Sequence, residues 1–90
     1  MQVRFSKRFG KSYEKADLKT RRAFNKRLKL FLQNQLHPLL NNHSLTGKLS
    51  GYRSINVTGD WRAIFSITIN EEGEQIAIFE MLGTHSQLYK

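Results

Sequence analysis

Two histidines and one aspartate are the residues of this chain best suited to moving protons. His43 lies in a polar loop, Asp60 at a turn, and His85 just after the last apolar run. Histidine suits both proton transfers of an acid–base reaction because its ordinary pKa lies near neutrality. The third histidine, His37, precedes Pro38 at an expected helix end. There we expect a structural role, in which it bonds the last helix carbonyls or interacts with the helix dipole.

Cations and aromatic rings stand close to these positions in the sequence. The candidate phosphate ligands are Arg62, Arg53 and Lys48, and the candidate stacking rings are Trp61, Tyr52 and Tyr89. Arginine stays charged and binds phosphate through two parallel N–H donors. Aromatic side chains hold unstacked bases. The set predicts a metal-independent chemistry on RNA, in which a base activates the ribose 2′-hydroxyl and an acid protonates the departing 5′-oxygen.

Each of these residues also has an ordinary structural interpretation, which stays open at this point. Trp61 and Tyr52 can pack on a sheet, and Asp60 can stabilise its own turn. Lys48 and Arg53 can be solvated surface, and Tyr89 can anchor the C-terminal segment. No two histidines have the spacing of a helical metal site, so no metal is expected.

Length and composition narrow the choice of protein class. Ninety residues without cysteine fit one domain, residues 1–90, and exclude disulfides, thiolate metal sites and cysteine nucleophiles. The apolar runs are too short to span a bilayer, and the N-terminal segment lacks the apolar run of a signal peptide. We therefore expect a cytoplasmic domain with no membrane partner and no cofactor.

The charge is strongly basic and unevenly spread. The chain carries a net charge of +8, and residues 1–30 hold eleven basic and two acidic residues. Residues 71–90 hold four acidic residues and one basic residue. A basic domain of this size predicts a polyanion or an acidic protein as its partner. The basic N-terminal part is expected to contact RNA or to receive an acidic partner, while the chemistry lies after residue 42.

The elements that must position these residues can be predicted from periodicity. Residues 2–5 alternate as a short strand, and Ser6 and Asp17 can cap two following helices. The second of these is expected to be amphipathic, about 17 residues long, with apolar positions at Phe24, Leu28, Phe31, Leu32 and Leu36. His37–Pro38 is expected to end it, because the residue before proline avoids the helical region.

The second half of the chain predicts strands. Residues 37–51 are expected to form a loop, and residues 52–57, 61–69 and 75–82 to form three strands, with a tail from Gly83. The predicted fold class is α+β, with two N-terminal helices packed on one face of a four-stranded, mainly antiparallel sheet in the order β-α-α-β-β-β.

Three segments together resemble a known family. They are HSLTGKLSGYR (residues 43–53), GDWRAIF (residues 59–65) and LGTHSQLY (residues 82–89). They are similar to toxins of bacterial type II toxin–antitoxin systems, of the RelE/ParE superfamily and nearest its YafQ-like branch. The resemblance covers nearly the whole chain. It implies an endoribonuclease that cleaves mRNA on the ribosome and is inhibited by a cognate antitoxin.

The resemblance also implies roles for individual residues. In the YafQ-like branch the positions of His43, Asp60 and His85 belong to the active site, and Trp61 and Tyr89 stand at its tryptophan and terminal aromatic positions. Arg62 matches an arginine that contacts phosphate in many relatives. We expect Asp60 and His85 to share the base and acid roles, and His43 to orient the substrate or join the proton transfer. The basic second helix is expected to contact ribosomal RNA.

This sequence departs from the pattern of that branch at two positions. Asn56 stands where the pattern has a histidine, and Met81 where it has an arginine. Asparagine cannot titrate and methionine cannot hold a phosphate, so either Arg62 and Arg53 take the cationic role or the activity is reduced. A ParE-type toxin, which shares the fold and inhibits DNA gyrase without nuclease residues, is the alternative.

Overall fold

The structure is a computed structural model that describes residues 1–89. The elements in chain order are β1 (Gln2–Phe5), α1 (Lys7–Lys15), α2 (Leu18–Gln33), η1 (Pro38–Leu40), β2 (His43–Ser44), η2 (Gly47–Leu49), β3 (Arg53–Asn56), β4 (Trp61–Ile69), β5 (Gln75–Thr84) and α3 (His85–Leu88). The two η elements are single 3-10 turns. No helix within the described part is long and apolar enough to cross a membrane.

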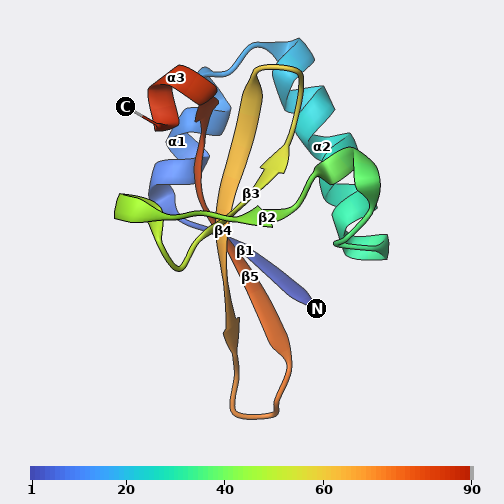
Figure 1. Ribbon diagram of the computed structural model, residues 1–90. Helices are drawn as coiled ribbons and strands as arrows, with labels where there is room; N and C mark the ends of the chain where they lie inside the picture. The colour runs from blue at the N-terminus through green and yellow to red at the C-terminus, as the bar shows by residue number, and fades with distance from the viewer. Residues whose placement is uncertain (90) are drawn as a thin grey trace.

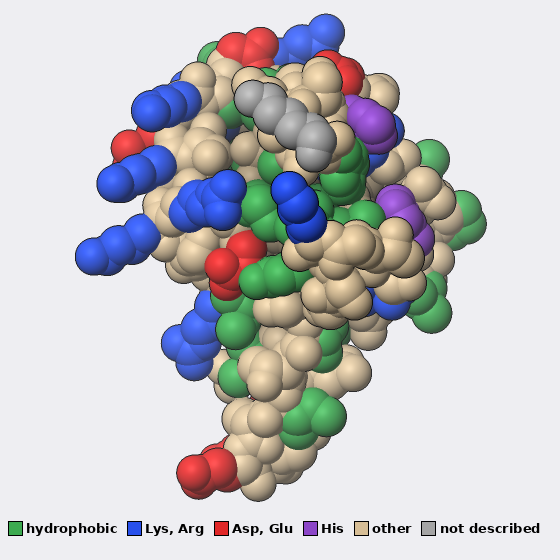
Figure 2. All heavy atoms as spheres, turned by 60° about the vertical axis from the view of Figure 1, so that its left-hand side comes forward, with side chains coloured by type: hydrophobic (Ala, Val, Ile, Leu, Met, Phe, Trp, Pro, Cys, Tyr) green, Lys and Arg blue, Asp and Glu red, His purple; other side chains and the backbone are tan. Residues whose placement is uncertain are grey.

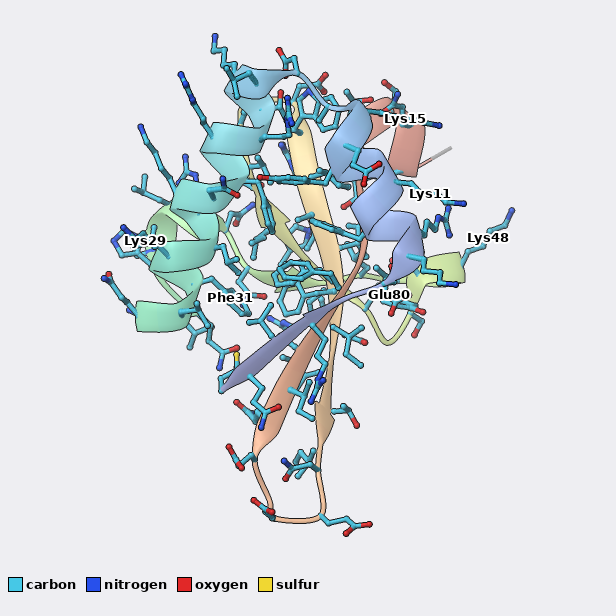
Figure 3. The ribbon with its side chains drawn as sticks, turned by 180° about the vertical axis from the view of Figure 1, so that it is seen from behind. Lys11, Lys15, Lys29, Phe31, Lys48 and Glu80 are labelled. Carbon is cyan, nitrogen blue, oxygen red and sulfur yellow. The ribbon has the colours of Figure 1, made fainter. Side chains whose placement is uncertain are left out.

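The strands form one sheet in the order β1-β5-β4-β3-β2. β1 runs parallel to β5, and the other neighbouring pairs are antiparallel. Helices α1 and α2 cover one face of this sheet, as the view from behind shows (Figures 1 and 3). The predicted α+β class and helix placement are therefore confirmed. The sheet has five strands, so the predicted number of four is wrong.

The fifth strand, β2, lies inside the segment predicted as a plain loop. It is only two residues long, and it pairs His43 with Ser54 and Ser44 with Arg53 of β3. Two residues show no alternation of apolar and polar positions, so a periodicity argument has nothing to detect. The strand exists because β3 offers it an edge with unpaired backbone groups.

Both predicted helix caps are confirmed. The side chain of Ser6 accepts a hydrogen bond from the Phe9 N–H at 3.0 Å, and that of Asp17 accepts one from the Thr20 N–H at 3.0 Å. Each satisfies an amide that the first helical turn leaves without a partner. The hydrogen bonds from Thr20 lower the pKa of the Asp17 carboxyl below its ordinary value, because they favour the charged form.

Aromatic packing holds the helices on the sheet. Phe79 of β5 lies at the centre of this cluster, with ring centroids 5.1 Å from Phe65, 5.5 Å from Phe31, 5.6 Å from Phe24, 5.8 Å from Phe9 and 5.9 Å from Phe5. The stacked, tilted and edge-to-face arrangements of these rings are favourable at these distances beyond the area that they bury. The cluster joins β1, both helices and both long strands, so it fixes the frame of the sheet.

The predicted apolar stripe of α2 extends too far. The helix ends at Gln33, and Leu32 and Leu36 are 51% and 70% exposed. The Asn34 N–H closes the last turn on the Leu30 carbonyl, and the chain then turns before it reaches Pro38. Likewise the tail predicted from Gly83 is wrong over residues 83–88, since β5 continues to Thr84 and α3 follows, whereas the predicted end of the tail at Lys90 lies outside the described residues.

The charges separate in space as they do in sequence. Basic side chains, with a few acidic ones among them, project from the helical end, whereas the tip of the protruding β4–β5 hairpin carries acidic side chains (Figure 2). The acidic residues of this hairpin turn are Glu71, Glu72 and Glu74. A polyanion is therefore attracted to the helical end and repelled from the hairpin tip.

Candidate active site

The junction of β4, β5 and α3 brings Asp60 and His85 together. Trp61 pairs with Thr84 across the strands, and the His85 N–H donates to the Asp60 carbonyl at 3.0 Å. Thr84 then starts α3 with a capping box, in which its hydroxyl and the Gln87 side chain each accept an amide proton. Two exposed side chains from positions 25 residues apart thus lie at one corner of the sheet.

Helix α3 sets the His85 ring against that of Tyr89. The two ring centroids are 4.7 Å apart in an edge-on arrangement, and a hydrogen bond links the Tyr89 hydroxyl to Ser54 Oγ at 3.1 Å. Ser54 is fully buried on β3. The hydrogen bond to the buried Ser54 hydroxyl therefore fixes Tyr89, and with it the adjacent His85 ring, on the sheet. Nothing in the sequence marked Ser54 as a site residue.

His43 lies on the same face as this Tyr89–Ser54 contact. Residues directly opposite each other in an antiparallel pair point to one face, and His43 is paired with Ser54. His43 Nδ1 lies 2.8 Å from the Asn41 carbonyl. A carbonyl only accepts, so Nδ1 carries the proton, and the neutral ring keeps its lone pair on Nε2. The His43 side chain is exposed, so this tautomer offers Nε2 as an acceptor.

Asn56, Arg62 and Gly83 form the next row of residues on this face. Arg62 is paired with Asn56 on one side and with Gly83 on the other. One guanidinium nitrogen of Arg62, Nη1, donates to the carbonyls of Thr58 and Trp61 at 3.0 Å and lies 3.3 Å from that of Gly59. Arg62 therefore braces the turn that carries Asp60, while its Nε and Nη2 groups hold three further donors.

Asn56 and Arg53 have less favourable surroundings for catalysis. The Asn56 Oδ1 is buried without a hydrogen-bond partner in the part of the chain that the structure describes. The Arg53 Nε donates to Asn42 Oδ1 at 2.8 Å, and Asn42 in turn donates to the Gln35 carbonyl. Arg53 thus holds the segment before β2 against the sheet.

An open hollow of about 630 Å³ lies beside α3. We call it the tyrosine hollow, and its lining residues are Arg8, Thr46, Lys48, Leu49, Tyr52, Met81, Leu88 and Tyr89. It brings together three residues singled out from the sequence, Lys48, Tyr52 and Tyr89. Figure 3 shows Lys48 projecting on the same side as Lys11 and Lys15 of α1. Two cations and two phenol rings around one open volume suit a phosphate with an attached base.

Arg8 is a member of this hollow that the sequence analysis did not identify. It lies on α1, next to the buried Phe9, in a helix rich in lysine and arginine. Nothing in the sequence distinguishes it from the other basic residues of α1. Its importance comes from the packing of α1 beside β5, which brings Arg8 to the same hollow as Met81.

Trp61 lies apart from the tyrosine hollow. It is half-buried against the hydrophobic core, and it lines a separate depression with Ala16, Leu82 and Gln87. His37 is also elsewhere: its Nδ1 accepts the Leu39 N–H at 3.1 Å and caps η1. Its role is thus structural, as predicted, although it caps the following turn instead of closing α2. Within residues 1–89, no cluster of acidic and histidine side chains could hold a metal ion.

Gly83 allows α3 to lie on the sheet. A methyl group there would lie 3.1 Å from Gln87 Oε1 and 3.2 Å from Leu88 Cδ2, closer than ordinary packing. We expect Gly83→Ala to displace α3 and to speed amide hydrogen exchange at Gln87 and Tyr89 several-fold.

Gly10→Ala is the matched control for this prediction. No atom lies within 4 Å of a methyl group at Gly10, which is inside α1. This change is expected to stabilise the fold by roughly 0.5–1 kcal/mol and to leave the exchange of α3 unaltered. Unchanged exchange in Gly83→Ala would show that the docking of α3 does not depend on the missing side chain.

Comparisons with known proteins identify a family and a fold. The family model described as the bacterial toxin YafQ of type II toxin–antitoxin systems matches residues 1–90. The chain is similar to the crystal structure of YafQ from E. coli strain BL21(DE3), with 24% identity, a TM-score of 0.79, and 99% and 98% of the two chains covered. No curated protein matches the sequence.

Two further solved structures share the fold. A YoeB/ParE toxin from Agrobacterium tumefaciens has 17% identity and a TM-score of 0.76, with 94% of this chain and 99% of that one covered. A chain of the E. coli DinJ–YafQ complex has 24% identity and a TM-score of 0.69, with 99% and 98% covered. At these identities the structures show a common fold.

Proposed function

Because this chain belongs to the YafQ family of toxins of type II toxin–antitoxin systems, we propose that it is an endoribonuclease that cleaves mRNA on the ribosome. It would act as a single toxin domain over residues 1–90 and need neither a metal nor another cofactor. Two observations together carry the proposal: the backbone hydrogen bond from His85 to Asp60 brings these residues to one corner of the sheet, and the His85 ring contacts Tyr89, which lines the cationic tyrosine hollow.

The proton transfers fall to three side chains. Asp60 and His85 share the roles of general base and general acid, one taking the 2′-hydroxyl proton and the other protonating the 5′-oxygen. His43 joins the transfer or orients the substrate, since its Nδ1–H bond to Asn41 leaves Nε2 as the acceptor. The edge contact with Tyr89 limits the rotation of the His85 ring, which keeps this proton carrier in position between turnovers.

The negative charge that develops on the phosphate is met by cations. Arg62 offers its remaining donors above the Asp60 turn, and Lys48 lines the tyrosine hollow. Preorganised donors of this kind stabilise the transition state more than the ground state. Arg8 adds a second positive charge to the hollow, on the side where Met81 contributes none.

Tyr89 and Tyr52 are the rings on which a base would stack, because both line the hollow. Trp61 and Arg53 stay predicted substrate ligands. Trp61 can reach RNA only from the depression beside α1, and Arg53 only through its Nη groups while its Nε holds Asn42. Their substitution is therefore expected to affect cleavage less than that of Lys48 or Tyr89.

The proposed partners are a cognate antitoxin and the translating ribosome with its mRNA. A structural neighbour of this chain is the toxin chain of a complex between YafQ and DinJ, a toxin–antitoxin pair. The basic surface of α1 suits the phosphates of ribosomal RNA. mRNA and ribosomes also set the proposed location of the reaction, the cytoplasm.

A cleavage assay tests this proposal directly. Purified toxin is mixed with a defined mRNA, with and without ribosomes, and the cut sites are mapped by primer extension. We expect cuts within codons that depend on ribosomes, with products that end in a 2′,3′-cyclic phosphate or 3′-phosphate. That end group is the signature of attack by the 2′-hydroxyl.

The same preparation is tested in a DNA gyrase supercoiling assay. Gyrase-dependent DNA cleavage without RNA cleavage would favour the ParE-type alternative and contradict the proposal. RNA products with a 3′-hydroxyl would contradict the mechanism, because they require a different nucleophile.

A further inference from the structure

Another surface depression lies along α2. The ribbon of α2 lies on the side of the molecule away from α3 (Figure 1). We call the depression the α2 groove, and it is lined by Leu18, Lys19, Arg22, Ala23, Lys26, Arg27, Leu30, Leu39 and Val57. Its volume is about 710 Å³. Arg27 Nη1 donates to the Leu39 carbonyl at 3.0 Å, which fixes the wall that η1 contributes. It shares no residue with the tyrosine hollow.

All charged residues that line the α2 groove are basic. Four of its lining residues are lysine or arginine, and Lys19, Arg22 and Lys26 follow one another at helical spacing. The sequence holds no acidic residue between Asp17 and Asp60, so the segments that form the groove supply no carboxylate of their own. An occupant with negative charge is therefore favoured.

The rest of the lining is aliphatic. Leu18 and Leu39 are 53% and 59% exposed, and Val57 is buried at the base. None of the nine lining residues is aromatic. Nucleic acids are held by phosphate contacts and by stacking on aromatic rings, and they gain little from exposed leucines. A protein segment with its own aliphatic side chains covers these leucines and releases the water on them.

We propose that the α2 groove binds an acidic amphipathic segment of a partner protein. Aliphatic side chains of the segment lie between Leu18 and Leu39, and its carboxylates face Lys19, Arg22 and Lys26. The distance along α2 from Leu18 to Leu30 is about 18 Å, which corresponds to roughly twelve residues of a helical partner. This inference rests on the proposed function, under which the segment belongs to the antitoxin.

The position of the groove has a consequence for inhibition. Because the α2 groove and the tyrosine hollow share no residue, a segment bound along α2 leaves the hollow open. Such a segment attaches the partner protein to the toxin. Inhibition of RNA cleavage then requires another part of the partner protein, or another subunit of the complex that it forms. An isolated groove-binding peptide is thus expected to bind without inhibiting cleavage of a short RNA.

A binding experiment with synthetic probes tests the proposal. The probe is a fluorescein-labelled helical peptide of about 16 residues, with leucines on one face and glutamates elsewhere. A control peptide keeps the glutamates and replaces the leucines by serine. Binding to the toxin is followed by fluorescence anisotropy and by amide shifts in the ¹⁵N spectrum. We expect saturable binding of the leucine peptide, at least about tenfold tighter than the control, with shifts at α2 and η1.

Three toxin variants assign the binding to the groove. Arg22→Glu and Leu39→Ser should each weaken peptide binding about tenfold. Lys11→Glu changes the net charge by the same amount as Arg22→Glu but lies on α1, outside the α2 groove, and should alter binding by no more than about twofold. Circular dichroism checks that each variant is folded.

Two outcomes would overturn the proposal. One is peptide binding that is absent, or that is equally strong in wild type, Arg22→Glu and Leu39→Ser. The other is a labelled single-stranded RNA that loses affinity with Leu39→Ser as the peptide does, which would make the groove an RNA surface. Neither readout uses RNA cleavage, so a failure of the proposed nuclease function is recognised separately in the cleavage assay.

Discussion

Replacing His85 with alanine is expected to lower the rate of RNA cleavage by about 10²–10⁴-fold, with little change in stability. The side chain is exposed at the start of α3, so its loss leaves no cavity. The His85 N–H still donates to the Asp60 carbonyl, because that bond belongs to the backbone. The variant thus removes one proton carrier and keeps the corner of the sheet intact. Single-turnover cleavage of a short RNA measures the loss.

His37→Asn is the matched control. It also removes one histidine, but asparagine keeps an acceptor for the Leu39 N–H that His37 now binds. Cleavage by this variant should stay within about twofold of wild type, since η1 takes no part in the tyrosine hollow. Cleavage by His85→Ala at the wild-type rate, with the fold preserved, would remove His85 from the mechanism.

The frame of the fold was predictable because it follows from local patterns. Ser6 and Asp17 were identified as caps from residue type and position alone, and both accept the expected amide protons. The bounds of β4 also agree with the prediction, since its nine residues are dense in β-branched and aromatic side chains. These elements carry their own signal in the sequence.

The remaining elements are too short to show periodicity. β2 has two residues and forms because β3 offers an edge. α3 has four residues and begins with a local capping box, Thr84 with Gln87, which periodicity does not detect. Leu32 and Leu36 continue an apolar pattern that the turn after Gln33 interrupts. Neither partner pairing nor a turn of this kind can be detected from periodicity.

Some residues of the candidate site could also be predicted from the sequence, and others could not. His43, Asp60 and His85 were singled out by residue type at loops and strand ends, and the pairing of the strands puts His43 on the Ser54 face and His85 beside Asp60. Ser54 and Arg8 could not be identified from the sequence, because their importance comes from contacts in the folded chain. The Tyr89 hydroxyl is hydrogen-bonded to Ser54, and Arg8 lines the tyrosine hollow from α1. The catalytic roles of these residues stay predictions that the variants test.

Arg8 leads to the second large effect that we expect. If Arg8 supplies the cation that Met81 cannot, Arg8→Ala should lower kcat/KM for RNA cleavage by roughly 10–100-fold, as the loss of a charge-assisted hydrogen bond would. Lys11→Ala removes the same charge from the same helix but does not line the tyrosine hollow. It should cost no more than about threefold, and that cost should disappear at higher salt.

Rescue of Arg8→Ala by Met81→Arg distinguishes a role in the hollow from general attraction of RNA. Met81 lines the same hollow as Arg8, so an arginine at position 81 returns a guanidinium to that volume from β5. The double variant should recover most of the lost kcat/KM. Glu14→Gln in the Arg8→Ala background restores the same net charge from an exposed position of α1 outside the hollow, and it should recover little. If only the net charge of α1 mattered, both second changes would restore cleavage equally. Position would then be irrelevant, and Arg8 would contribute only to the net charge of the helical end.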